Sequence, residues 1–414
     1  MERQAGFLDV MKFRDFRLLW TGQLISITGS QMRMVAVDWQ VYEIATKQGF
    51  NPALALGAIG LMRVIPMTLT ALFAGVAADR FERRKVIMIT SFVALFASVI
   101  LALAGSLETP NLMIVYAMVV VTAIASAFEM PARQALTPAL VPAPMLSQAM
   151  SAGIISWQLA TVLGPSIAGI LISVYGVVPL YWIDAASYLA VVYAAVMMRP
   201  VVVDSNRPPV RMKDAFEGLK FVFKHRIMSS TMLLDFFATF FGAATTLMPI
   251  FANEILHVGA QGYGLMRAAP SVGAVAAAVL LTSRRITRQG PVLLISVGIF
   301  GVSMAVFGAS SWYPLTLFTL AMSGAADTIS MIIRGTLRQL LTPDDLRGRM
   351  TAVNMIFVAG GPQLGEFVVG ITASIIGAPL AVLIGGILCV GLVAGTALKV
   401  PELRKLDTPE TLAR

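Results

Sequence analysis

The sequence predicts an all-α membrane protein with twelve transmembrane helices arranged as two parallel-repeat six-helix bundles. Three observations support this: the composition, the length of the apolar segments and the placement of the cations. Mean hydropathy is +0.80, and only 13% of the 414 residues are charged, whereas soluble domains carry about 25% charged residues. A soluble domain is therefore excluded.

Twelve apolar segments follow one another along the chain, separated by short polar loops. Each is about 19 to 28 residues long, which as a helix covers the hydrocarbon core of about 30 Å. They are predicted at residues 17–44, 56–78, 86–106, 112–133, 148–173, 178–198, 229–252, 262–284, 291–309, 313–334, 350–376 and 379–398.

The cations fall on one side of this arrangement. All but four of the 31 lysines and arginines lie at the ends of the chain or in alternate loops on the same side as the ends. The exceptions are Lys47, in an opposite loop, and Arg33, Arg63 and Arg267, inside spans. By the positive-inside rule, both termini are expected in the cytoplasm.

The longest polar stretch, residues 199–228, divides the chain into an N-terminal bundle at 1–198 and a C-terminal bundle at 229–414. Apolar residues at three- and four-residue spacing predict a short amphipathic helix in this cytoplasmic linker, although a plain linker is the alternative. Gly60-Leu61-Met62-Arg63 recurs as Gly264-Leu265-Met266-Arg267 at the same point of the second and eighth spans. This recurrence indicates a parallel repeat, which is typical of rocking-bundle transporters.

The loop after the second span reads Gly75-Val76-Ala77-Ala78-Asp79-Arg80-Phe81-Glu82-Arg83-Arg84. It resembles the G-x-x-x-D-R-x-G-R-R signature of the major facilitator superfamily, with Glu82 in place of the inner glycine. The resemblance covers essentially the whole chain and implies the major facilitator fold. It also implies a gating motif formed by Gly75, Asp79, Arg80, Arg83 and Arg84; the alternative is that the cations only set topology.

The fifth span carries Gly164-Pro165-Ser166-Ile167-Ala168-Gly169. This segment resembles the G-P-x-x-G-G signature of proton-coupled exporters, in which Gly164, Pro165 and Gly169 would allow helix flexing. Segments around Pro131–Pro142, Ile183–Ser187 and Leu247–Ala252 resemble the branch that holds enterobactin, macrolide and multidrug exporters. That resemblance implies efflux of small lipophilic or siderophore-like molecules. The arginine that many drug/proton antiporters carry inside the fourth span is missing here, so their mode of proton coupling does not transfer directly to this chain.

Ionisable residues inside the spans are expected to carry the chemistry, because a charge at the bilayer centre costs roughly 2.5–3.5 kcal/mol and must face protein or water. In the superfamily, the first, fourth, seventh and tenth spans line the central cavity. Their carboxylates are the proton-coupling candidates: Asp38 and Asp235 first, then Glu129. Glu129 lies four residues before Arg133 and could instead belong to a gate.

The remaining candidates fall into two groups. Arg33, Asp327 and Trp157 are the candidates for contact with the cavity or the substrate. The intramembrane charges expected to be structural are Arg63, Arg267, Asp184 and Glu366.

Motifs for other functions are missing from the sequence. There is no phosphate-binding loop, no Cys/His cluster and no nucleophile elbow, so an enzyme, a metal site and a cofactor are not expected. The positive-inside rule accounts for the net charge of +9, so nucleic-acid binding is not expected either. We predict a monomeric exporter in the inner (cytoplasmic) membrane that works by alternating access and proton antiport. Its partners are the lipid bilayer, a small-molecule substrate and protons. A lipid or lysolipid flippase of the same fold and a non-transporting receptor or scaffold are the alternatives.

Overall fold

The computed structural model describes residues 7–199, 220, 222, 224–282, 286–342, 347–404 and 406. Over these residues it is helical with connecting turns and contains no strand, which confirms the predicted fold class. The predicted linker helix falls almost entirely outside the described residues.

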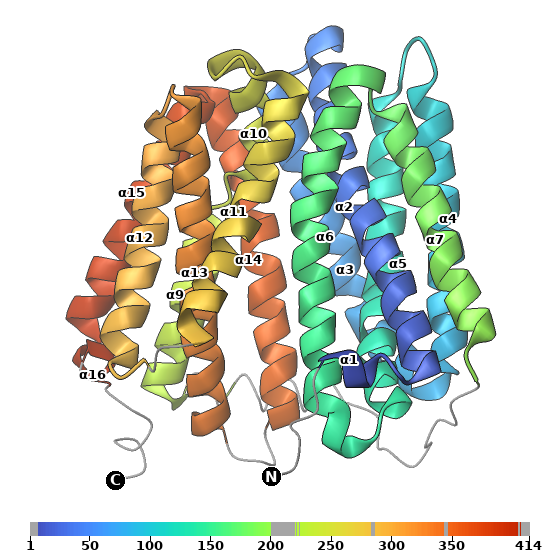
Figure 1. Ribbon diagram of the computed structural model, residues 1–414. Helices are drawn as coiled ribbons and strands as arrows, with labels where there is room; N and C mark the ends of the chain where they lie inside the picture. Colours follow the sequence, from blue (N-terminus) through green and yellow to red (C-terminus); the bar gives the residue numbers. More distant parts are fainter. Residues whose placement is uncertain are drawn as a thin grey trace. The chain divides into compact units, whose positions relative to one another are not determined.

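Within the described residues, eleven of the twelve predicted spans correspond to single long helices, and the seventh begins with α9 (Figure 1). Their bounds are α2 Arg14–Gln48, α3 Pro52–Arg80, α4 Arg83–Gly105, α5 Leu112–Leu136, α6 Leu146–Tyr175, α7 Val178–Met197, α9 Arg226–Phe241, α11 Gly259–Thr282, α12 Gln289–Ala309, α13 Tyr313–Leu341, α14 Arg347–Ile376 and α15 Ala378–Lys399. Short helices α1 Phe7–Val10 and α16 Pro401–Arg404 lie near the two ends.

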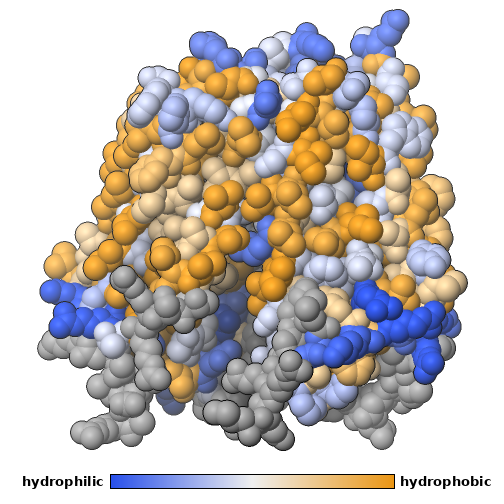
Figure 2. Space-filling view, viewed as in Figure 1, coloured by the Kyte–Doolittle hydropathy of each residue, from blue (hydrophilic) through white to orange (hydrophobic). Residues whose placement is uncertain are grey.

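Ten helical stretches in the described part of the chain are long and apolar enough to cross a membrane, judged by length and composition. The other two long helices, α2 and α14, coincide with the first and eleventh predicted spans. On the face drawn in Figure 2, hydrophobic residues cover the middle of the helices and hydrophilic residues gather near the helix ends. This distribution is the one a bilayer requires.

The seventh span is broken, where the sequence predicted one span over residues 229–252. Helix α9 ends at Phe241, and the chain continues through a 3₁₀ turn at Thr245–Leu247, α10 at Met248–Ile250 and a π-helical turn at Phe251–Ile255. A Cβ at Gly242 would lie 2.3 Å from the ring of Phe300, so a larger residue where the helix stops would require that ring to move. Pro249 lacks the amide that would continue the hydrogen-bond ladder.

The chain forms two compact units. One comprises residues 1–48 and 65–210, and the other comprises residues 49–64 and 211–414. In the first unit, α2 packs against α6 and α7, and α4 packs against α5 and α7. In the second unit, α9 packs against α14 and α15, and α12 packs against α13 and α15. Corresponding helices therefore have corresponding neighbours, which is the arrangement of a parallel repeat.

Each unit contains a cluster of buried apolar side chains. Leu19, Ile87 and Val191 belong to a buried cluster of the first unit. Leu234, Leu293 and Leu337 belong to a buried cluster of the second unit. These clusters hold the helices that carry the charged groups described below.

Helices α11 and α13 cross at two glycines. A Cβ at Gly324 would lie 1.9 Å from the carbonyl oxygen of Pro270, and a Cβ at Gly273 would lie 1.8 Å from that of Ala321. Such small residues allow the close approach of helices in a membrane.

We expect Gly324→Ala to destabilise the protein by about 1–3 kcal/mol, because the methyl group overpacks this crossing. The matched control is Gly335→Ala on the same helix, where a Cβ meets nothing within 4 Å; it should be neutral or stabilising by about 0.4–1 kcal/mol. Thermal unfolding in detergent measures both. Equal unfolding temperatures for the two variants would contradict the crossing described here.

Candidate functional site

A charged cluster lies inside the second unit, between α9 and α13. The carboxylate of Asp235 on α9 lies 2.5 Å from a guanidinium nitrogen of Arg334 on α13. Another nitrogen of Arg334 lies 3.6 Å from Asp327, which precedes it by two turns on the same helix. The side chain of Asp235 is 9% exposed, whereas that of Asp327 is 46% exposed. One arginine therefore joins a buried carboxylate to a more exposed one.

Two small cavities meet at the Asp235–Arg334 pair. The first, of about 20 Å³, is lined by Met228, Thr231, Met232, Asp235, Arg334, Leu337, Arg338, Leu341 and Asn354. The second, of about 10 Å³, is lined by Asp235, Ala238, Thr239, Val297, Phe300, Asp327, Ser330 and Arg334. A water molecule needs about 10–15 Å³, so each cavity has the size of about one water.

This arrangement is suited to proton-linked changes. An ionised Asp235 forms a charge-assisted bond with Arg334, and a protonated Asp235 would lose the charge that holds the arginine. Ionisable residues within membrane spans commonly belong to ion pathways and proton relays. The cluster can thus convert the gain or loss of one proton into a change in the contact between α9 and α13.

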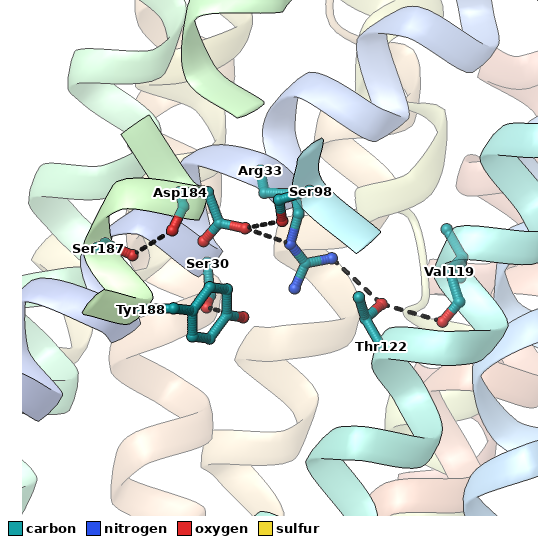
Figure 3. Close-up of polar contacts among 8 residues, drawn as sticks. All are labelled: Ser30, Arg33, Ser98, Val119, Thr122, Asp184, Ser187 and Tyr188. Carbon is teal, nitrogen blue, oxygen red and sulfur yellow. Dashed lines mark hydrogen bonds and ion pairs between the residues drawn. The ribbon is translucent and has the colours of Figure 1, made fainter. Parts of the chain in front are cut away.

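A second buried network lies in the first unit and is shown in Figure 3. The Nε of Arg33 donates to Asp184 at 2.8 Å, and its Nη1 donates to Thr122 at 3.2 Å. The hydroxyl of Ser98 donates to the same carboxylate at 2.6 Å. Arg33 is 8% exposed and Asp184 is fully buried, so the pair ties α2 to α7 and its neighbours inside the unit.

Arg33, predicted to contact a cavity or the substrate, thus lies in an internal ion pair with Asp184. Asp38, also on α2, is buried at 2% exposure and lines neither of the two cavities described above. Glu129 forms an ion pair with Arg133 on the same helix, as the four-residue spacing suggested. Trp157 on α6 is 50% exposed.

The predicted gating motif is described only in part. Gly75, Asp79 and Arg80 lie in the last turns of α3, and their surroundings fall outside the described residues. Arg83 donates to the carbonyl oxygen of Ala135 at 2.9 Å, and Arg84 donates to that of Met198 at 2.6 Å. These arginines therefore tie the start of α4 to the ends of two other helices.

Glu82, which replaces the inner glycine of the signature, forms local ion pairs. Its carboxylate lies 3.1 Å from both Arg84 and Lys85. The departure from the signature thus adds an acidic partner for the cations that follow it.

The glycine-proline segment of the fifth span lies in α6 where that helix meets α2. A Cβ at Gly164 would lie 2.5 Å from the Cβ of Gln31 and 3.0 Å from the carbonyl oxygen of Thr28. Pro165 and Gly169 are buried in the same stretch. The glycine is therefore required for close packing at this crossing.

The intramembrane charges predicted to be structural also include a pair in the second unit. A guanidinium nitrogen of Arg63 lies 3.9 Å from Glu366 on α14. The hydroxyl of Thr245, at the break of the seventh span, lies 3.5 Å from the other oxygen of Glu366. Arg267 lies in α11 and is half-buried.

Sequence reasoning missed three features of these sites. Two are the ion pairs of Arg33 with Asp184 and of Asp235 with Arg334, and the third is the position of Ser330 in the lining of the second cavity. The sequence contains opposite charges inside spans, which implies pairing, but spacing within one helix does not identify a partner on another helix. No sequence signal distinguishes Ser330 from other span hydroxyls.

Comparisons with known proteins agree with the fold and the spans. The transmembrane secretion effector family matches residues 7–412. An enterobactin exporter, EntS, of Citrobacter koseri is 27% identical over 89% of this chain and 88% of its own, and EntS of Escherichia coli O127:H6 is 26% identical over the same shares.

Solved transporters share the fold. A bacterial homologue of the iron transporter ferroportin has a TM-score of 0.68 at 15% identity, covering 92% of this chain and 98% of its own. A POT family transporter in complex with 5-aminolevulinic acid has a TM-score of 0.76 at 10% identity, covering 97% and 98%. Because the family and these relatives are transporters, the prediction that the chain is not an enzyme is confirmed. The chain is a multi-pass membrane protein that belongs to the transmembrane secretion effector family of the major facilitator superfamily.

Proposed function

We propose that this protein exports a small lipophilic or siderophore-like molecule across the inner membrane in exchange for protons. Its similarity to enterobactin exporters over 89% of the chain supports this direction of transport and this substrate class. The parallel repeat supports alternating access, in which two similar bundles expose a central site to each side in turn.

The observation that carries the proton-coupled part of the proposal is the buried ion pair between Asp235 and Arg334. It lies on two helices that correspond to cavity-lining spans of the superfamily, and its two residues line the two small cavities described above. A carboxylate that exchanges a proton needs access to water, and Asp235 lines two cavities that each have the size of about one water molecule. We therefore assign the transported proton to Asp235.

The other carboxylate candidates are less suited to this role. Glu129 pairs with Arg133 on its own helix, which favours a place in a gate. Asp38 is buried in α2 away from the two cavities. The proposal also includes termini in the cytoplasm, which the cation distribution supports. It includes a monomeric state as well. A membrane potential of 100 mV would supply about 2.3 kcal/mol for each charge moved inward.

The proposal is tested with the full-length protein in liposomes that contain a pH-sensitive dye. A pH gradient is imposed, and enterobactin, a macrolide and a lipophilic cation are added in separate trials. We expect proton flux that depends on at least one of these compounds and that is missing from protein-free liposomes. A folded protein that moves none of the compounds and no protons would contradict antiport, and a fluorescent-lipid flip assay on the same liposomes would then test the flippase.

A further inference from the structure

The second cavity contains a hydroxyl whose bonding differs from that of its neighbours on α13. Ser330 is 1% exposed, and its Oγ has no hydrogen-bond partner among the described residues. The other serine and threonine hydroxyls of this helix each donate to a backbone carbonyl three or four residues earlier: Thr316, Thr319, Ser323, Thr328 and Thr336. Buried polar atoms are normally satisfied by protein or by ordered water, so an ordered water is a suitable partner for Ser330.

The cavity beside Ser330 can supply this partner. It has a volume of about 10 Å³, which is about the space that one water molecule requires. A buried water also needs two to four polar neighbours. Besides Ser330, the lining contains the polar residues Asp235, Thr239, Asp327 and Arg334.

The polar neighbours have complementary roles. Thr239 donates to the carbonyl oxygens of Asp235 and Phe236 at 2.9 and 3.1 Å, so its oxygen is left to accept. The hydroxyl of Ser330 can donate to a water, and that water can donate to a carboxylate. Arg334, which pairs with both carboxylates, balances their charge.

Exposure differs sharply between the two carboxylates. The side chain of Asp235 is 9% exposed, and that of Asp327 is 46% exposed. A water in the cavity that both residues line would give a proton a path from the exposed Asp327 to the buried Asp235.

We propose that Ser330 holds an ordered water between Asp327 and Asp235, and that this water relays protons between the two carboxylates. A protonated Asp327 gives its proton to the water as the water gives another to the Asp235 carboxylate. The net change is one proton moved, with the water regenerated and no covalent bond altered otherwise. Ser330 is a positioning residue in this relay, and the inference rests on the proposed proton coupling through Asp235.

The test compares Ser330→Ala with Ser323→Ala in the full-length protein. Ser323 is buried on the same helix, but its hydroxyl already donates to Leu320 at 2.7 Å, so it is a matched control. We expect Ser330→Ala to lower compound-driven proton flux in liposomes on the order of tenfold, while the dissociation constant of the transported compound stays unchanged. Ser323→Ala should leave both quantities as in the wild type. Wild-type flux in Ser330→Ala would overturn the relay even if Asp235→Asn had abolished transport.

A second measurement reports on the water without transport. Infrared spectra of the purified protein in ordinary water and in water labelled with oxygen-18 identify bands of bound water by their isotope shift. We expect such a band in the wild type and in Ser323→Ala, and its loss in Ser330→Ala. A band that persists in Ser330→Ala would overturn the water site. A band that behaves as expected in a protein without proton flux would instead support the water site and contradict the proposed function.

Discussion

Replacing Asp235 with asparagine is expected to abolish compound-driven proton flux, with a loss on the order of 100-fold or more. The amide cannot take up and release the proton, while its size and shape are nearly those of the carboxylic acid. Arg334 keeps Asp327 within 3.6 Å as a charged partner, so the variant should still fold. The measurement is proton flux in liposomes that contain a pH-sensitive dye, with enterobactin or the best compound of the panel.

The matched control for this variant is Glu402→Gln, also a carboxylate-to-amide change in the second unit. Glu402 forms an exposed ion pair with Arg226 at 2.8 Å, far along the chain from the cluster. Its flux should equal that of the wild type. Unchanged flux in Asp235→Asn would contradict the assignment of the proton to this residue. Asp38 would then be the next candidate for the proton carrier.

The largest effect on stability is expected for Asp184→Asn. This change removes the negative charge beside Arg33 and leaves a guanidinium that is 8% exposed without its anion. Removing one partner of a buried ion pair typically costs about 3–5 kcal/mol, because the remaining charge stays buried. We expect a loss of stability of about that size for this variant. Denaturant unfolding in detergent, followed by circular dichroism, measures the loss.

Two further variants separate charge burial from the loss of a contact. The double variant Arg33→Met with Asp184→Leu removes both charges and should recover much of the lost stability, because apolar pairs can replace buried ion pairs. Glu402→Gln breaks an exposed pair and should cost less than about 1 kcal/mol. If Asp184→Asn were as stable as Glu402→Gln, the network in Figure 3 would not hold the first unit together.

Much of the fold could be predicted from the sequence because a bilayer imposes simple rules. Spans must be apolar and about 20 residues long, and cations stay on one side, so hydropathy and charge fixed the order of the helices. The break after Phe241 was not predictable in this way. Apolar residues continue on both sides of the break, and the ring of Phe300 that lies against Gly242 comes from a different helix.

The candidate site was predictable in its residues but not in its connections. Asp235 and Asp327 stood out because charges within spans are costly. That Arg334 joins the two carboxylates depends on how α9 packs against α13, and spacing within a single helix carries no information on this. Ser330 is distinguished only by the absence of a hydrogen-bond partner among the described residues. The other serine and threonine hydroxyls of α13 bond to carbonyl oxygens of the chain just before them, as Ser323 and Thr328 do.

The central claim is that Asp235 carries the proton that drives export, and comparing two transport modes in Asp235→Asn tests it most directly. One mode is exchange of labelled for unlabelled compound at equal pH, and the other is accumulation of the compound against its gradient, driven by a pH difference. We predict that exchange continues, because binding and alternating access remain, while driven accumulation falls to the level of protein-free liposomes. Driven accumulation at the wild-type level would contradict the claim.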